Sequence, residues 1–315
     1  SLVRVHRLYL VLVLFLVAEH AASEVSARRF MWAYRVGASA GAVYNLDHWY
    51  LKYQALGPAE RLQGLFSTAM TSGNLHATSF VGAVAVALGL TGWLRVAGVG
   101  TGILSGVGLA ATFTRSSWLG AAAGVAALVV SGRRWRMLVL GGVAIALLVA
   151  LVPPVRQRAV SIVIPPSEGD VFASGFTSSG RISLWLTGLE LFAERPITGW
   201  GLADHSRLIR EHRRADATFE AGHFHSNLVQ VAVATGSVGL VAYVLFQGSL
   251  LVLLWRRRRQ SVWAWAAIGV WFNFQIAGLF DWSFGDAEVT YQFFWWMGLG
   301  LSGAGPGLVD RDQRS

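Results

Sequence analysis

The chain has 315 residues, of which 54% are hydrophobic and 14% are charged, and its mean hydropathy is +0.49. Soluble domains carry about 25% charged residues, so this composition indicates an integral membrane protein. The absence of cysteine excludes disulfides, thiolate metal sites and a thiol nucleophile. The net charge of +9 comes from short basic runs between apolar segments, which favours helices oriented against a bilayer over nucleic-acid binding.

The chain starts at Ser1, and a basic stretch leads directly into the apolar run Leu8 to Ala18. Together with the small residues at Ala21 to Ser23, this start resembles a signal peptide. We favour a membrane helix in a chain whose natural N-terminus is missing. In that case Arg28 and Arg29 face the cytoplasm, whereas after a cleaved signal they would face outward.

Runs of largely apolar residues predict an all-α protein, a polytopic transmembrane helical bundle of about eight or nine spans, each needing about 20 residues. The predicted spans cover residues 7–23, 30–46, 76–94, 97–114, 117–132, 136–153, 226–254, 261–280 and 289–304.

The basic runs Arg133 to Arg136 and Arg256 to Arg259 are short loops, and the positive-inside bias places both in the cytoplasm. Two sizeable connections, residues 47–75 and 154–225, then lie on the non-cytoplasmic side. The prediction is therefore a region of N-terminal transmembrane helices (1–153), a large extracytoplasmic loop (154–225) and C-terminal transmembrane helices with a short tail (226–315).

The large loop is charge-balanced and long enough to be functional. Its start, from Pro165 to Ser179, has the composition of irregular chain. Ile182 to Ala193 is predicted to form a short amphipathic helix, and Asp204 to Arg214 a second, basic one. The basic helix is expected to lie on anionic headgroups, and we include its Arg210 among the candidates for substrate binding.

Two arginines on the predicted outer side are candidates for binding an anion. Arg115 lies between two apolar spans at their outer end, against the positive-inside bias. It either snorkels to headgroups or provides a fixed cation for an anionic ligand. Arg181 opens the amphipathic loop helix and is either a solvated charge or a phosphate ligand, because a guanidinium binds phosphate oxygens in a bidentate manner. Together the two side chains are able to clamp a diphosphate without a metal.

Two histidines, His223 and His225, lie beside Asn227 and Gln230 where the large loop re-enters the membrane. Two histidines without a third ligand make a weak zinc site. A general base is the better role, because a neutral imidazole takes a proton from a hydroxyl near pH 7. The sequence does not distinguish which histidine is the base. Three acidic residues of an outer turn are an alternative base or cation site: Asp281, Asp286 and Glu288.

Several segments resemble the O-antigen ligase-like family, which comprises O-antigen ligases, O-antigen polymerases and O-linked oligosaccharyltransferases. The resemblance spans roughly residues 55–305. It rests on these segments: RLQGLFSTAMT at 61–71, TRSSW at 114–118, GRISLW at 180–185, AERPITGWG at 193–201 and HFHSNLVQVAVATGSVG at 223–239.

The resemblance implies a metal-independent, inverting glycosyltransferase without cofactors in the bacterial inner membrane. It would transfer a glycan from an undecaprenyl-diphosphate carrier to a hydroxyl of lipid A core, polysaccharide or protein, on the periplasmic face. Arg115 and Arg181 would bind the diphosphate and stabilise its leaving charge. His225 would orient or deprotonate the acceptor hydroxyl, with His223 as the neighbouring option, and His223 and Asn227 would contribute to substrate binding. Ser226 and Asn227 stand where the family pattern suggests an acidic residue.

Two other classes of function remain open at this point. A membrane transporter for an anion or small solute would carry polar residues near the midplane of broken spans, whereas the ionisable residues here lie near the outer edge. A non-catalytic envelope assembly protein would tolerate loss of Arg115, Arg181 and His225.

Overall fold

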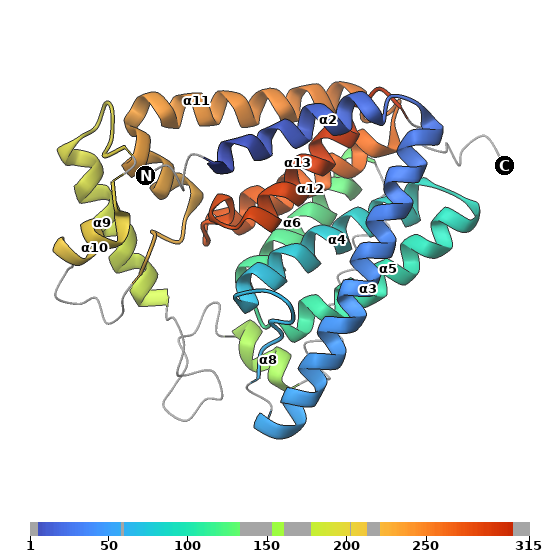
Figure 1. Cartoon of the computed structure of the whole chain (residues 1–315), viewed down its shortest axis with the longest axis horizontal. Helices are drawn as coiled ribbons and strands as arrows, with labels where there is room; N and C mark the ends of the chain where they lie inside the picture. Colours follow the sequence, from blue (N-terminus) through green and yellow to red (C-terminus); the bar gives the residue numbers. More distant parts are fainter. Residues whose placement is uncertain are drawn as a thin grey trace.

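The computed structural model describes residues 6–57, 60–132, 153–160, 178–201, 203–212 and 221–304, and within these ranges all regular structure is helical. The elements, which are shown in Figure 1, are η1 (His6–Val11), α2 (Leu12–His20), α3 (Glu24–Leu56), α4 (Ala69–Gly89), α5 (Gly92–Ala111), α6 (Arg115–Ser131), α8 (Pro153–Val160), α9 (Ser178–Glu194), α10 (His205–Glu211), α11 (Asn227–Arg257), α12 (Val262–Gly278), η2 (Ser283–Gly285) and α13 (Ala287–Leu301).

Hydroxyl side chains fix where four of the long helices begin. Ser23, Thr68, Ser226 and Ser261 each precede a helix, and each side-chain oxygen accepts the backbone N–H three residues further on. Such N-caps satisfy a donor that the helix itself leaves unpaired. The cap at Thr68 starts α4 well before the apolar run at 76, so that the first turns of this helix carry polar side chains.

Helix α4 lies at the centre of a helical bundle, which we define as α4, α5, α6, α12 and α13. It contacts α5, α6, α12 and α13, while α13 also packs against α2. Small residues allow close approach: a Cβ on Gly124 of α6 would lie 2.6 Å from the carbonyl oxygen of Gly269 on α12. The core contains fully buried Trp263, Trp265 and Trp296.

Every predicted span within the described residues corresponds to helix, so the all-α prediction is confirmed. The span at 136–153 lies almost wholly outside the described residues. By length and composition, two described helices are able to cross a membrane, α5 and α11. The first predicted span is interrupted, because a 3₁₀ helix precedes the nine residues of α2. The prediction of eight or nine spans, and the three-part division of the chain, therefore remain predictions.

A separate cluster forms where the large loop meets the bundle. Helices α9 and α10 lie beside the start of α11 at one side of the molecule (Figure 1). We call residues 178–201, 203–212 and 221–226 the loop module. Its small core, to which α11 contributes Val233, is made of Leu184, Leu191, Leu208, Ile209, Phe224 and Val233.

The two helices predicted in the loop are present. The helix expected at Ile182 to Ala193 is α9, which begins earlier, at Ser178. The basic one is α10, for which Asp204 is the N-cap and accepts the backbone N–H of Ser206. The irregular chain predicted at Pro165 to Ser179 lies outside the described residues except for its last two positions, which are helical.

Candidate functional site

The turn between α5 and α6 positions Arg115 as the first residue of α6. Phe113 in this turn has a left-handed φ of 48°, a conformation that is uncommon for a bulky side chain. The Thr114 hydroxyl donates to the carbonyl of Ala69 over 2.9 Å, which ties the turn to the first turn of α4. The half-buried Arg115 is therefore fixed at the end of the bundle where α4 and α6 begin; we call this the site end.

Arg61 lies at the same turn, although no role was predicted for it from the sequence. Its Nε donates to the carbonyl of Thr112 and its Nη2 to the hydroxyl of Thr114, each over 2.9 Å. Burial, with smaller contributions from the charges of Arg181 and Arg115, lowers the pKa of Arg61 to about 10. A role for Arg61 could have been predicted from the sequence. Arg61 is the charged residue of RLQGLF, which is one of the segments on which the family resemblance rests.

Arg181 reaches the same place from the loop module, in the first turn of α9. Its Nη2 lies 4.0 Å from the sulfur of Met70 on α4. Burial lowers the pKa of Arg181, the Asp281 carboxylate raises it, and the charge of Arg115 lowers it. Three guanidinium groups from three separate segments thus act on one another electrostatically within a half-buried region. Arginines gathered in this way attract an anion.

The two histidines occupy a tight turn immediately before α11. Their rings lie 4.0 Å apart between centroids, and Nδ1 of His223 accepts the backbone N–H of His225 over 3.2 Å. Burial lowers the pKa of His223 to about 4, the neighbouring His225 lowers it as well, and Asp281 opposes the shift. His223 is therefore a neutral ring near pH 7 that holds the backbone of His225, whose φ of 47° is left-handed.

Asp281 connects the histidines to the bundle. Its Oδ1 lies 3.5 Å from Nδ1 of His225, and its Oδ2 accepts from Nδ2 of Asn74 over 3.1 Å. Asn74 in turn accepts from the Ser117 hydroxyl over 2.8 Å. Asp281 is 4% exposed, so its carboxylate is held away from solvent beside the His225 ring. A carboxylate at one ring nitrogen of a histidine orients the imidazole.

Three other residues singled out from the sequence are Asn227, Gln230 and Arg210. The first two have structural contacts, and Arg210 is an exposed residue of α10. Asn227 is buried, and its Oδ1 accepts the backbone N–H of Ser283 over 2.9 Å. Gln230 is also buried, and its Oε1 accepts the backbone N–H of Phe224 over 3.1 Å. Both amides fix the chain around the histidine turn. Arg210 is exposed on α10, and substrate binding by Arg210 or Asn227 remains a prediction.

A backbone joint attaches the loop module to α11. The backbone N–H groups of Trp200 and Gly201 donate to the carbonyls of Val233 and Ala234 over 2.8 Å each, and that of Ser237 donates to Pro196 over 2.7 Å. Gly236 interrupts the helical backbone of α11 with a φ of 63°, and a Cβ there would lie 2.2 Å from the carbonyl oxygen of Ile197. The segments 193–201 and 234–239 therefore serve to dock the module.

The outer carboxylates do not gather into one group. Asp281 contacts His225 and Asn74, whereas Asp286 accepts from the Thr71 hydroxyl over 2.7 Å and Glu288 is exposed. In the part of the chain that the structure describes, no set of three or more acidic or histidine side chains is close enough to hold a metal ion.

In the described residues all regular structure is helical, two helices are long and apolar enough to cross a membrane, and the cationic, histidine-bearing end is suited to an anionic substrate. The family model described as O-Antigen ligase matches residues 100–244, a range that contains Arg115, Arg181, His223 and His225. This match, which covers less than half of the chain, supports the resemblance to the O-antigen ligase-like family, whose members are membrane glycosyltransferases of the ligase or polymerase type. A comparison with curated proteins gave no match.

Proposed function

We propose that the protein transfers a glycan from an undecaprenyl-diphosphate carrier to an acceptor hydroxyl on the outer face of the inner membrane. The observation that carries this proposal is the convergence of Arg61, Arg115 and Arg181 beside the paired His225 and Asp281. The arginines suit a diphosphate, and the histidine–carboxylate pair suits a hydroxyl that must lose a proton. A transferase of this kind needs both groups at one place.

In the proposed reaction, the acceptor oxygen bonds to the anomeric carbon as the bond from that carbon to the diphosphate oxygen breaks. Attack from the face opposite the leaving group inverts the anomeric centre. The proton of the hydroxyl moves to His225, and the electron pair of the broken bond leaves with the carrier diphosphate. Arg115 and Arg181 stabilise the negative charge that develops there, without a metal ion as a required partner.

Between the two histidines, the contacts favour His225 as the base. Nδ1 of His223 already accepts the backbone N–H of His225, and its pKa of about 4 makes it a weak proton acceptor. Nδ1 of His225 faces the Asp281 carboxylate, which leaves Nε2 for the acceptor hydroxyl. His223 is then a positioning residue, and Arg61 has the same role for the turn that carries Arg115.

The test is glycan transfer in membranes from a defined undecaprenyl-diphosphate donor, with EDTA present. Arg115→Ala and Arg181→Ala should each lower the rate by about 10²–10³-fold, and His225→Ala by about 10²–10⁴-fold. Arg207→Ala is the matched control, because it removes an exposed arginine of the same loop module to which no role in substrate binding is assigned. Expression of each variant is checked by immunoblotting.

Two outcomes would contradict the proposal. Transfer that disappears with EDTA and returns with a divalent cation would require a metal in the reaction. Absence of transfer by the parent protein to lipid A core, polysaccharide and protein acceptors, together with uptake of a solute into proteoliposomes, would favour the transporter.

A further inference from the structure

One face of α9 carries a narrow row of exposed apolar side chains. Its three large members follow one another at spacings of four and three residues: Ile182, Leu186 and Leu189. They are between 40% and 56% exposed. Ala193 lies one turn further on, so the four side chains share one face of the helix. We call these four residues the α9 stripe, which is about 16 Å long at about 1.5 Å per residue.

Packing within the loop module does not use the α9 stripe. The opposite face of α9 contributes Leu184 and Leu191 to the module core. Gly188 lies on that inner face, and a Cβ there would be 2.4 Å from Cγ1 of Val229 on α11. The inner face of α9 is therefore closely packed, whereas the stripe leaves apolar surface exposed, which is unfavourable in water.

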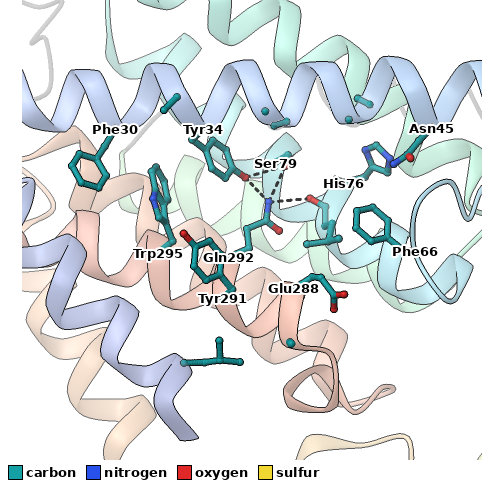
Figure 2. A pocket seen from close by; sticks show the side chains of 18 residues that line it. Phe30, Tyr34, Asn45, Phe66, His76, Ser79, Glu288, Tyr291, Gln292 and Trp295 are labelled. Atoms are coloured by element: carbon teal, nitrogen blue, oxygen red, sulfur yellow. Dashed lines mark hydrogen bonds between the residues drawn. The ribbon is translucent and has the colours of Figure 1, made fainter. Parts of the chain in front are cut away.

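The α9 stripe differs from the groove that lies between α3, α4 and α13 in the bundle. That groove has a volume of about 790 Å³, and Gln292 within it donates to the hydroxyls of Ser79 and Tyr34 (Figure 2). A hollow with a few polar groups is suited to a discrete ligand. The stripe is a row on the outside of a helix and contains no hydrogen-bonding side chain, so it is suited to a continuous apolar medium.

An exposed apolar surface leads from the end of α9 to α11. The carbonyl oxygen of Ile197 accepts the backbone N–H of Val238 over 3.4 Å, and the side chains of these two residues are each 65% exposed. Further along α11, Val241 and Leu245 are exposed as well. Helix α11 is long and apolar enough to cross a membrane, and the exposed apolar face of a membrane-spanning helix lies against lipid.

The direction of α9 fits the surface of the membrane that α11 would cross. Figure 1 shows α9 running across the direction of α11, beside the end at which α11 begins. An amphipathic helix that lies along a membrane buries its apolar face about 5–10 Å into the boundary between headgroups and acyl chains. After α9, the guanidinium carbon of Arg195 lies 4.2 Å from the centroid of the Trp200 ring. Tryptophan and arginine are side chains that favour this boundary.

The size and the charge of this surface favour lipid over a protein partner. A stable protein interface takes about 20–30 residues from each side, whereas the α9 stripe and Ile197 together comprise five. The described residues of the loop module contain four arginines and four acidic residues, so attraction of the whole module to anionic headgroups is weak. Apolar contact is then the force that holds α9 at the membrane.

We propose that the α9 stripe and Ile197 insert into the membrane leaflet at the site end, so that the bilayer holds the loop module as a second attachment beside the backbone joint. Arg181 directly precedes Ile182, so the depth of α9 in the leaflet sets the depth of the guanidinium that Arg181 contributes to the candidate site. This insertion does not depend on the proposed glycan transfer.

The test measures the depth of single nitroxide labels, which is direct because the chain has no cysteine. The whole chain is reconstituted in phosphatidylcholine vesicles with one label at a time. Leu186→Cys and Leu189→Cys report on the stripe, Val244→Cys on the exposed face of α11, and Arg207→Cys on the exposed surface of α10. Electron paramagnetic resonance then compares collisions with oxygen, which concentrates in lipid, and with a water-soluble nickel chelate. The labels on α9 and α11 should collide mainly with oxygen, and the Arg207 label mainly with nickel.

Three results would overturn the proposal. Stripe labels that collide with nickel as readily as the Arg207 label would place α9 in water. Stripe labels shielded from both reagents would show that a protein partner or a second copy covers them. In phosphatidylglycerol vesicles the depth should be the same, and a stripe that is buried only there and is released by about 0.5 M salt would assign the binding to headgroup charge.

A second experiment keeps the label away from the two leucines. With the label at Ala193→Cys, the change Leu186→Gln/Leu189→Gln should shift its collisions from oxygen toward nickel, because the amide side chains favour water. Arg207→Gln is the control and should leave the Ala193 label unchanged. If the glutamine variant also leaves it unchanged, the stripe does not hold α9 at the membrane. Glycan transfer is assayed separately, so a failure of the transferase proposal does not alter either reading.

Discussion

The helical bundle and the loop module reach the candidate site by different kinds of contact. In the bundle, helices pack through glycines such as Gly120 and Gly124, and the turn that carries Arg115 is tied to α4 by Thr114. The loop module has a much smaller core, and its attachment to α11 depends on backbone hydrogen bonds around Gly236. The site is therefore assembled from one part fixed by helix packing and one part fixed by a local joint.

This difference divides the proposed chemistry between the two parts. The bundle and its turns contribute Arg61, Arg115 and Asp281, whereas the loop module contributes Arg181 and both histidines. The bundle and the loop module each hold at least one arginine of the site. The proposed base, His225, is in the module, whereas the carboxylate that faces it, Asp281, is on the bundle side. Catalysis should accordingly depend on how accurately the module is docked, and on the side chains that both parts contribute.

The largest effect should come from combining one arginine of each part. If Arg115 and Arg181 bind the same diphosphate, removing either already loses most of the charge stabilisation, about 10²–10³-fold in rate. The double variant Arg115→Ala/Arg181→Ala should then fall clearly short of the product of the two single losses, because contacting groups are not additive. Rates in a double-mutant cycle test this coupling, and strict multiplication would place the arginines in separate sites.

Changing the joint itself should detach the module. Gly236→Ala puts a Cβ 2.2 Å from the Ile197 carbonyl at a left-handed φ, so we expect a loss of about 3 kcal/mol or more in stability, in the range of steric and backbone-strain effects. Thermal unfolding in detergent, followed by tryptophan fluorescence, measures the loss. Gly248→Ala in the same helix, where a Cβ meets nothing within 4 Å, is the control. Equal melting temperatures for the two variants would show that the joint does not hold the module.

The Asp281 carboxylate, which belongs to the bundle side and faces His225 of the loop module, should affect kcat more than it affects donor binding. Asp281→Asn keeps the shape but removes the charge beside His225, and kcat should fall about 10–100-fold, as for a weakened general base. Because Asp281 also opposes the positive charge of Arg181, KM for the donor should stay equal or decrease. Asp286→Asn serves as the matched carboxylate control. A rise in donor KM with unchanged kcat would make Asp281 a structural residue only.

The effect that should be smallest near neutral pH is a dependence of stability on pH through His223. Its pKa falls from 6.5 in the unfolded chain to about 4 in the folded protein, so the unfolded state binds the proton more readily. The contribution of His223 is complete above about pH 6.5 and is lost as the pH falls toward 4, by up to about 3 kcal/mol in all. His223→Gln should flatten this part of the pH profile of unfolding. A variant profile that is as steep as that of the parent would assign the pH dependence to other groups.

The candidate site was predictable from the sequence in part. Arg115, Arg181 and His225 stand in motifs that can be read locally, and their predicted common side is consistent with the way the described helices bring them together. Arg61 and Asp281 were not assigned these roles, because their partners are remote in the sequence: Arg61 bonds Thr114 and Asp281 faces His225. Contacts across 50 residues or more leave no periodic pattern in a single sequence.

The sequence by itself determined the helical class, most helix positions and the residues able to carry charge, because these depend on local hydropathy and residue chemistry. Only the tertiary structure decided that His223 positions His225, that 193–201 docks on a kink in α11, and that α3 flanks a groove. Each of these depends on side chains and backbone groups brought together by packing. Backbone geometry such as the left-handed φ of His225 is likewise held by its surroundings and not by local preference.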